Sequence, residues 1–192
     1  MSRPLAILLP LAFLGMSVTP SQAQTSSVRM PDVLGAAFDP EAVGKGTLAD
    51  YDFLVGTWSF RFQPKGSDGS YGPPQTGTWT VRKNHGGHMI EDVWHIDGSD
   101  DPTITYRVYD PNAERWRLMG TRTSRGTWDP GISWSDGDQR FVVQTFREAL
   151  LARIRYFDIH PDHFLWRADV SQDEGQTWIL DAWSMDVTRT GE

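Results

Sequence analysis

The chain contains no cysteine, which excludes disulfide bonds and thiolate chemistry and leaves packing as the source of stability. The glycine-rich nucleotide-binding motifs and the common hydrolase motifs HExxH and GxSxG are also missing. Basic residues are in the minority, with 18 Lys and Arg against 25 Asp and Glu and a formal net charge of −7. This balance argues against nucleic acid or an anionic membrane surface as a partner.

The apolar run near the N-terminus, from Leu5 to Val18, is too short to span a membrane and is interrupted by Pro10. Arg3 precedes it, and Ser21-Gln22-Ala23 places small residues where a signal peptidase cuts. We therefore predict a secretory signal peptide at residues 1–23, a flexible leader at 24–46 and one domain at 47–192. No cysteine follows the signal in the lipid-attachment position, so we expect a soluble periplasmic or secreted protein without membrane insertion after cleavage.

Long helical periodicity is absent after Gly56, and short alternating segments are separated by turn signals such as Asp97-Gly98 and Asp136-Gly137. This spacing is typical of an all-β barrel or sandwich. An even number of strands lets the first and last strands pair antiparallel. We predict a closed antiparallel meander barrel with residues 48–54 as a short plug helix, and strands near residues 56–63, 77–84, 88–96, 103–110, 114–122, 132–135, 139–147, 151–159, 163–171 and 176–188.

The segment Gly56-Thr57-Trp58 opens the first predicted strand, and its alternation places Trp58, Phe60 and Phe62 on one face. Gly56 has no Cβ, so the chain can enter the strand at a sharp angle. Barrel closure would bring the end of the last strand beside Trp58. Arg189 is then expected to lie over that indole, the alternative being a frayed, solvated chain end.

A hairpin centred on Gly86-Gly87 gives a register that can be tested. It pairs Trp79 with Trp94 on one face and Arg82 with Glu91 on the other. A slipped register would lose both pairs, so we expect the two indoles to lie side by side.

Alternation predicts a strongly aromatic barrel interior, and a ten-stranded barrel is wide enough to leave a cavity. The alternative is a packed core without a ligand. The predicted ligand-binding residues are Trp79, Trp94, Tyr106, Trp116, Tyr156 and Trp166. The other predicted inward residues are Trp58, Phe60, Phe62, Val81, Ile90, Ile104, Val108, Leu118, Phe164, Trp178 and Leu180.

Seven arginines alternate with the aromatic residues and are expected on the outer face, paired with acidic residues such as Glu91, Asp169 and Asp181. The alternative places them inside, around an anionic ligand, and requires Trp116 and Trp166 to face outward. These arginines are Arg61, Arg82, Arg107, Arg117, Arg153, Arg155 and Arg167.

Few side chains suggest catalysis. His88 and Asp92 lie on the predicted inner face and are the candidate acid–base pair, although four residues of strand separate them by about 13 Å. That separation also prevents His85, His88 and Asp92 from forming one metal site, so no metal and no cofactor are predicted. The segment from Ser171 to Trp178 matches an Asp-box, which we interpret as a structural hairpin.

The run from Tyr51 to Trp58 resembles a bacterial family of uncharacterised lipocalin-like (calycin-type) proteins. Further matching pieces are Ile90-Glu91-Asp92-Val93-Trp94, Tyr106-Arg107-Val108-Tyr109-Asp110-Pro111, Arg115-Trp116 and Phe164-x-Trp166-Arg167. The resemblance implies a calycin barrel and brings no established activity. The chain departs from the family at His85-Gly86-Gly87-His88, where relatives carry an apolar residue and a single glycine. The haem-binding nitrobindins resemble it more distantly, and their glycine-rich opening is absent here.

Three functions remain open from the sequence. The first is a binding protein for a small hydrophobic or aromatic molecule inside the barrel. The second is a cofactor-free lyase, isomerase or hydratase that uses His88 and Asp92 on such a molecule. The third is a structural protein with a filled barrel.

Overall fold

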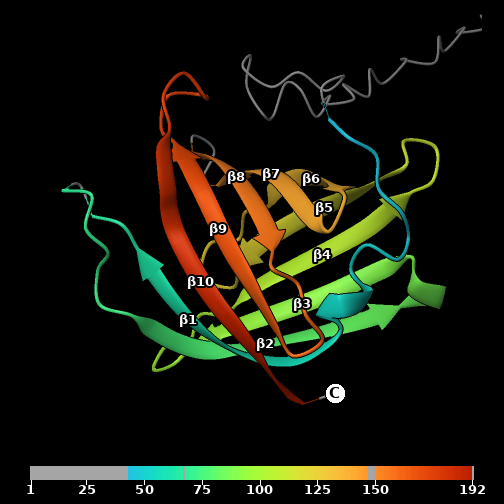
Figure 1. The fold of residues 1–192 in the computed structure, drawn as a ribbon, viewed down its shortest axis with the longest axis horizontal. Coiled ribbons are helices and arrows are strands. Elements are labelled where there is room, and N and C mark those ends of the chain that lie inside the picture. Colours follow the sequence, from blue (N-terminus) through green and yellow to red (C-terminus); the bar gives the residue numbers. More distant parts are fainter. Residues whose placement is uncertain (1–42, 67, 147–149, 192) are drawn as a thin grey trace, which may run out of the picture.

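The computed structural model describes residues 43–66, 68–146 and 150–191, which form one closed antiparallel barrel (Figure 1). Each strand pairs with its neighbours in the chain, and the last strand closes the barrel on the first. This confirms the predicted fold class. The predicted signal peptide and most of the predicted leader lie outside the described residues. The strands are β1 (Gly56–Pro64), β2 (Gln75–Asn84), β3 (Met89–Ile96), β4 (Thr103–Asp110), β5 (Arg115–Arg122), β6 (Asp129–Asp136), β7 (Gln139–Phe146), β8 (Leu150–Phe157), β9 (His163–Ser171) and β10 (Ile179–Gly191).

The predicted strands agree with the observed ones to within about two residues, except at β6 and β10. Strand β6 begins at Asp129 because Asp129 and Pro130 already pair with β5. Strand β10 begins at Ile179 and extends to Gly191, since the Asp-box turn takes up the residues before it. The extension of β10 is what allows it to run along the whole of β1.

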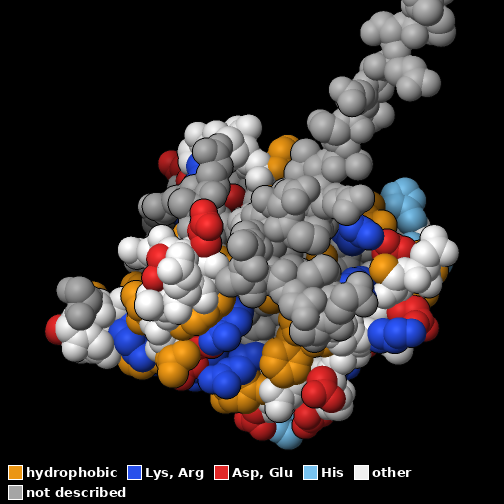
Figure 2. Space-filling view, turned by 90° about the horizontal axis from the view of Figure 1, so that it is seen from above, with side chains coloured by type: hydrophobic (Ala, Val, Ile, Leu, Met, Phe, Trp, Pro, Cys, Tyr) orange, Lys and Arg blue, Asp and Glu red, His pale blue; other side chains and the backbone are white. Residues whose placement is uncertain are grey.

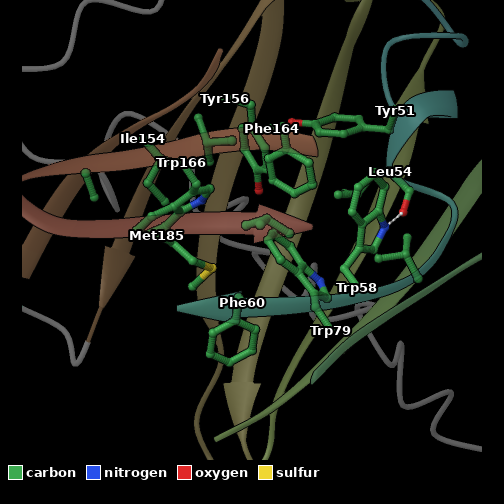
Figure 3. Packing of buried hydrophobic residues seen from close by; sticks show 14 of the residues in the cluster. Tyr51, Leu54, Trp58, Phe60, Trp79, Ile154, Tyr156, Phe164, Trp166 and Met185 are labelled. Atoms are coloured by element: carbon green, nitrogen blue, oxygen red, sulfur yellow. Dashed lines mark hydrogen bonds between the residues drawn. The ribbon is translucent and has the colours of Figure 1, made fainter. Parts of the chain in front are cut away.

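One end of the barrel is closed by the segment before β1, shown in cyan in Figure 1. The predicted helix over residues 48–54 is a turn followed by a single turn of 3-10 helix, η2 (Asp52–Leu54). Tyr51 and Leu54 are fully buried there. Trp58 packs edge-on against Phe164, with 4.9 Å between ring centroids, and its Nε1 donates to the Leu54 carbonyl at 2.8 Å (Figure 3).

Arg189 lies over Trp58, as the closure of the barrel predicted. Its Cζ is 4.0 Å from the Trp58 ring centroid, and its Nη1 and Nη2 donate to the carbonyls of Val55 and Phe53 at 2.8 Å each. A Cβ on Gly56, which has a φ of +128°, would lie 2.4 Å from Arg189 Nη1. Glycine is therefore required at this position both by the backbone conformation and by the closeness of the guanidinium.

The β2–β3 register is confirmed, with Trp79 opposite Trp94 and Arg82 opposite Glu91. The connection itself is longer than a two-residue turn. Pairing ends at Asn84 and Met89, and the short 3-10 helix η3 (His85–Gly87) links the strands with a positive φ at Gly86.

The predicted inner face of β4 is wrong. Ile104, Tyr106 and Val108 lie on the outer face, and Val108 is 49% exposed, whereas Thr105 and Arg107 are buried inside. The cause lies on β3, where the inward Asp92 stands opposite Thr105 and forms an ion pair with Arg107. An unpaired buried carboxylate would cost more free energy than is lost by leaving the three apolar side chains of β4 on the outer face. Arg107 therefore points inward.

The prediction for the start of β10 is also wrong, because Trp178 and Leu180 do not face the interior. Leu180 is 61% exposed, and Trp178 lies outside the barrel with its ring 3.9 Å from Arg153 Cζ. Trp183 and Met185 face the interior, so alternation along β10 places Trp178 and Leu180 on the opposite face. The register shift between Ile179 and Trp183 keeps that parity, because four residues of β10 span two residues of β9. Trp183 takes up the inward position instead.

The outer face carries the other predicted arginines among its charged side chains. Arg153 pairs with Asp169 at 3.0 Å and Arg155 with Asp181 at 2.8 Å, as expected. In Figure 2 basic and hydrophobic side chains lie against one another on the face seen from above. The Asp-box is formed, because Ser171 Oγ accepts from Gly175 N and Asp173 accepts from Thr177 N, both at 2.8 Å.

Residues 43–46, the last four of the predicted leader, lie against the outside of the barrel. Val43 is buried in a small outer cluster with Ile132, Val143 and Leu151. The Lys45 carbonyl accepts a hydrogen bond from the β6 backbone at Ser135. Within the described part of the chain, no helix has the length and apolar character that a membrane crossing requires.

Candidate ligand-binding site

The barrel interior is packed at the closed end and hollow toward the opposite end. The cavity has a volume of ≈ 220 Å³. Ten inner residues from seven strands give it a largely apolar and aromatic wall: Phe62, Trp79, Trp94, Phe146, Leu150, Ile154, Tyr156, Trp166, Trp183 and Met185. The polar residues that line it are Asp92, Thr103, Thr105, Arg107, Thr121, Arg122, Arg125, Asp129 and Gln144.

One aromatic part of the wall is built on β1, β2 and β3. Trp79 and Trp94 lie 6.1 Å apart at their ring centroids, with an angle of 30° between the rings. Trp94 is also edge-on to Phe60 at 5.9 Å and to Phe62 at 6.5 Å. These contacts fix the indoles in place, so that an apolar molecule would meet a rigid aromatic surface.

Asp92, Arg107 and Tyr156 form a polar cluster in the deep part of the cavity. Asp92 is 1% exposed and Arg107 3% exposed, and the two side chains form an ion pair. Trp79 Nε1 donates to Asp92 Oδ1 at 3.0 Å, and Arg107 Nη2 donates to the Tyr156 hydroxyl at 3.2 Å. The strands β2, β3, β4 and β8 thus each contribute one side chain to a connected network.

Two buried tyrosines stand beside Arg107. Its Cζ is 5.0 Å from the Tyr51 ring centroid, and the Tyr51 hydroxyl is hydrogen bonded to Ser133. Burial raises the pKa of Tyr156 to about 12, and it raises the pKa of Tyr51 as well, while the charge of Arg107 opposes both shifts. Both phenols are therefore neutral near pH 7 and act as hydrogen-bonding groups rather than as bases.

At the cavity rim, the loops after β3 and β5 are tied together. Asp101 accepts from Thr123 Oγ1 at 3.0 Å and from Ser124 Oγ at 2.7 Å. The Ser124 hydroxyl is the main reason why the pKa of Asp101 is lowered. Arg122, which lines the cavity, is 3.9 Å from the Asp101 carboxylate.

Four of the six predicted ligand-binding residues line the cavity: Trp79, Trp94, Tyr156 and Trp166 (Figure 3 labels three of them). Trp116 points inward but lies at the closed end, where it packs edge-on against Tyr51 at 5.6 Å and its indole donates to the Thr47 carbonyl. Tyr106 was placed on the wrong face and lies outside, with its ring 6.2 Å from that of Trp128.

The structure does not bring the two candidate catalytic residues together. Asp92 is buried in the polar cluster near the middle of β3, whereas His88 is exposed in the connection just before that strand. No group of three or more His, Cys, Asp or Glu among the described residues is arranged to hold a metal ion.

The favoured interpretation of the sequence placed Arg107 on the outer face, although a signal for its inward position was present. The confirmed hairpin register places Asp92 opposite Val81 on the inner face. A buried carboxylate needs a cationic or donor partner, and Arg107 is the arginine on the next strand. Applied to β4, that rule would have reversed the assignment of its faces.

Among solved structures, the chain is similar to an S-type phycobiliprotein lyase from Guillardia theta. The TM-score is 0.51 and the identity 9%, over 74% of this chain and 91% of the lyase chain. At this identity the similarity concerns the fold alone, and with the closed ten-strand barrel it fits a lipocalin-like calycin barrel. No protein-family model matches the sequence, and no curated protein does either.

Two further solved structures show weaker overlap. One is EF1p2-mFAP2b bound to DFHBI, with a TM-score of 0.37 and 15% identity over 76% of this chain and 100% of that one. The other is a protein of unknown function from Nostoc punctiforme, with a TM-score of 0.28 and 7% identity over 77% and 100% of the two chains.

Proposed function

We propose that this protein binds a small hydrophobic or aromatic molecule inside its barrel. The observation that carries the proposal is the ≈ 220 Å³ cavity with its aromatic wall and its few buried polar groups. Ligand pockets are typically apolar with a small number of polar groups that fix orientation. For scale, a dry apolar cavity of about 150 Å³ holds one benzene molecule.

The alternative of a filled barrel is less well supported than a binding site. Side chains fill the closed end, where Tyr51, Leu54 and Trp58 are fully buried. The same packing does not continue to the other end, where the walls separate around the cavity. The alternative of an enzyme that uses His88 with Asp92 loses its main support, since His88 is exposed and Asp92 is buried in the barrel.

Binding can be tested with naphthalene derivatives and with extracts of the native host. A bound molecule should quench the indole fluorescence of the cavity wall and raise the melting temperature by mass action. Trp94→Ala should weaken binding, because it removes part of the aromatic surface. Trp128→Ala is the matched control, since Trp128 is 51% exposed on the outer face.

The proposal fails if no probe binds and if protein purified from the native host releases no small molecule on denaturation, as judged by mass spectrometry. Equal loss of binding in both tryptophan variants would also count against it, because a site inside the barrel should not depend on Trp128.

We also propose that the chain is exported to the periplasm or secreted. The support is the sequence pattern of residues 1–23, with Arg3 ahead of the apolar run and small residues at 21 and 23. Fractionation of the native host followed by N-terminal sequencing should find a mature chain that begins at Gln24. A chain that keeps Met1 in the cytoplasmic fraction would refute export.

A further inference from the structure

The polar cluster contains a hydrogen-bond donor that the described part of the protein does not satisfy. Arg107 lines the cavity and is 3% exposed, yet its buried Nε has no hydrogen-bond partner among the described residues. Arg107 Nη1 and Asp92 Oδ2 face each other as the ion pair, and Nη2 is engaged with Tyr156. A buried N–H without an acceptor is costly, so an acceptor from a bound molecule would be stabilised here.

The charge of the cluster favours a neutral acceptor over an anionic one. Asp92 already balances Arg107, and both lie in a low-dielectric interior. A second carboxylate beside Asp92 would place two negative charges against one guanidinium. That arrangement carries a desolvation penalty and a repulsion that a carbonyl oxygen avoids.

The surroundings of the cluster favour an aromatic body attached to that acceptor. Trp79 donates to Asp92, so the indole that forms part of the aromatic wall is itself joined to the polar cluster. Ile154, Met185 and Trp166 lie on the opposite side of the interior (Figure 3). A flat ring system between these side chains can therefore direct a substituent toward Arg107.

The geometry points to a specific ligand class: a neutral aromatic carbonyl compound, with its ring against Trp79 and Trp94 and its carbonyl oxygen accepting from Arg107. The inference rests on the proposed function and adds to it the chemistry of the ligand's polar end. Asp92 holds the guanidinium in place and keeps the subsite electrically neutral. Arg107 is thus a specificity-determining residue for binding.

The test compares three probes of nearly equal shape by isothermal titration calorimetry. The probes are 2-acetylnaphthalene, 2-isopropenylnaphthalene and 2-naphthoate, in which the polar end is a carbonyl, a carbon–carbon double bond and a carboxylate. We expect 2-acetylnaphthalene to bind the native protein about 10-fold more tightly than 2-isopropenylnaphthalene, since one hydrogen bond from a charged donor supports that ratio. We expect 2-naphthoate to bind more weakly than 2-acetylnaphthalene.

Variants then assign the preference to the cluster. In Asp92→Asn/Arg107→Met the two charges are removed together and the Trp79 N–H keeps an acceptor, so the protein should fold and bind both neutral probes equally. Arg107→Lys keeps the charge beside Asp92 but lacks the Nε donor and the planar fork, and should reduce the preference. Arg117→Met, which removes an outer-face arginine paired with Asp110, is the matched control and should leave the preference intact.

A spectroscopic readout shows whether the carbonyl itself is contacted. The infrared stretch of 2-acetylnaphthalene labelled with ¹³C at the carbonyl should move to lower frequency on binding the native protein. In the double variant the bound probe should lack that shift. Retained binding of 2-isopropenylnaphthalene by the double variant shows that the barrel is folded.

The outcomes separate the inference from the proposed function. Equal affinity of the native protein for the two neutral probes, or tightest binding of 2-naphthoate, overturns the inference and leaves the proposed function standing. An unchanged preference in the double variant also overturns it. Failure of all three probes to bind the native protein refutes binding of ring systems of this size, and the inference with it.

Discussion

The buried ion pair between Asp92 and Arg107 offers the sharpest test of the structure. Arg107→Met removes the cation and leaves Asp92, which is 1% exposed, with the Trp79 indole as its hydrogen-bond donor. Breaking a buried pair by removing one partner costs about 3–5 kcal/mol, because a buried charge is left uncompensated. Asp92→Asn/Arg107→Met removes both charges and should lie within about 1–2 kcal/mol of the native protein.

The free energy of unfolding is measured by urea titration at pH 7 and followed by far-UV circular dichroism. The matched control is Arg117→Met, the same substitution on the neighbouring strand, where the arginine is exposed and paired with Asp110 at 2.9 Å. An exposed pair contributes about 0–1 kcal/mol, so the control should unfold nearly as the native protein does.

The expected signature is a single variant that is clearly less stable than the double variant. A loss below about 1 kcal/mol for Arg107→Met would refute the reasoning. It would mean that Arg107 is solvated on the outer face and that Ile104, Tyr106 and Val108 point inward, as hydrophobic alternation by itself predicted.

The remaining predictions concern the closed end and the pH dependence. Trp58→Ala should cost about 3–5 kcal/mol in urea unfolding, because it empties a fully buried site and leaves the Leu54 carbonyl without its donor; a loss below about 1 kcal/mol would contradict this. Arg189→Met should lower the melting temperature measurably, since three backbone carbonyls lose their donor. The raised pKa of Tyr156 stabilises the fold below about pH 10, and this contribution is lost as the pH rises toward 12; ultraviolet titration should find this phenol still protonated at pH 11. The lowered pKa of Asp173, about 2, acts in the opposite direction, because its contribution is present above about pH 4 and is lost as the pH falls toward 2; Asp173→Asn should remove that acid sensitivity.

Much of the fold follows from local sequence patterns. Turn residues at regular intervals and alternating segments were enough to predict ten strands and their antiparallel order. The Gly86-Gly87 turn gave the β2–β3 register, because one slipped residue would have exchanged the two faces. Pairing of the first and last strands then placed Arg189 over Trp58, a contact between residues far apart in the chain.

The candidate site was predictable only where the hydrophobic pattern is unambiguous. Trp79, Tyr156 and Trp166 lie on strands whose inner face is largely apolar, and Trp94 follows from the β2–β3 register. All four line the cavity. On β4 the hydrophobic pattern predicts the wrong inner face. Ile104, Tyr106 and Val108 are the more hydrophobic set, yet they point outward, and Thr105 and Arg107 point inward.

What the sequence by itself determined is the barrel, its strand order and its closed end, because these depend on short-range alternation, turn chemistry and pairing parity. The tertiary structure alone decided which way β4 and the start of β10 face. On β4 the deciding term is the electrostatic need of Asp92, a residue of the neighbouring strand. At the start of β10 it is a register shift, which takes residues 180–182 out of the pairing with β9 and leaves Leu180 exposed. Both effects change which side chains line the cavity, for example Arg107 and Trp183. The residues at the polar end of the candidate binding site could therefore not be assigned from the sequence.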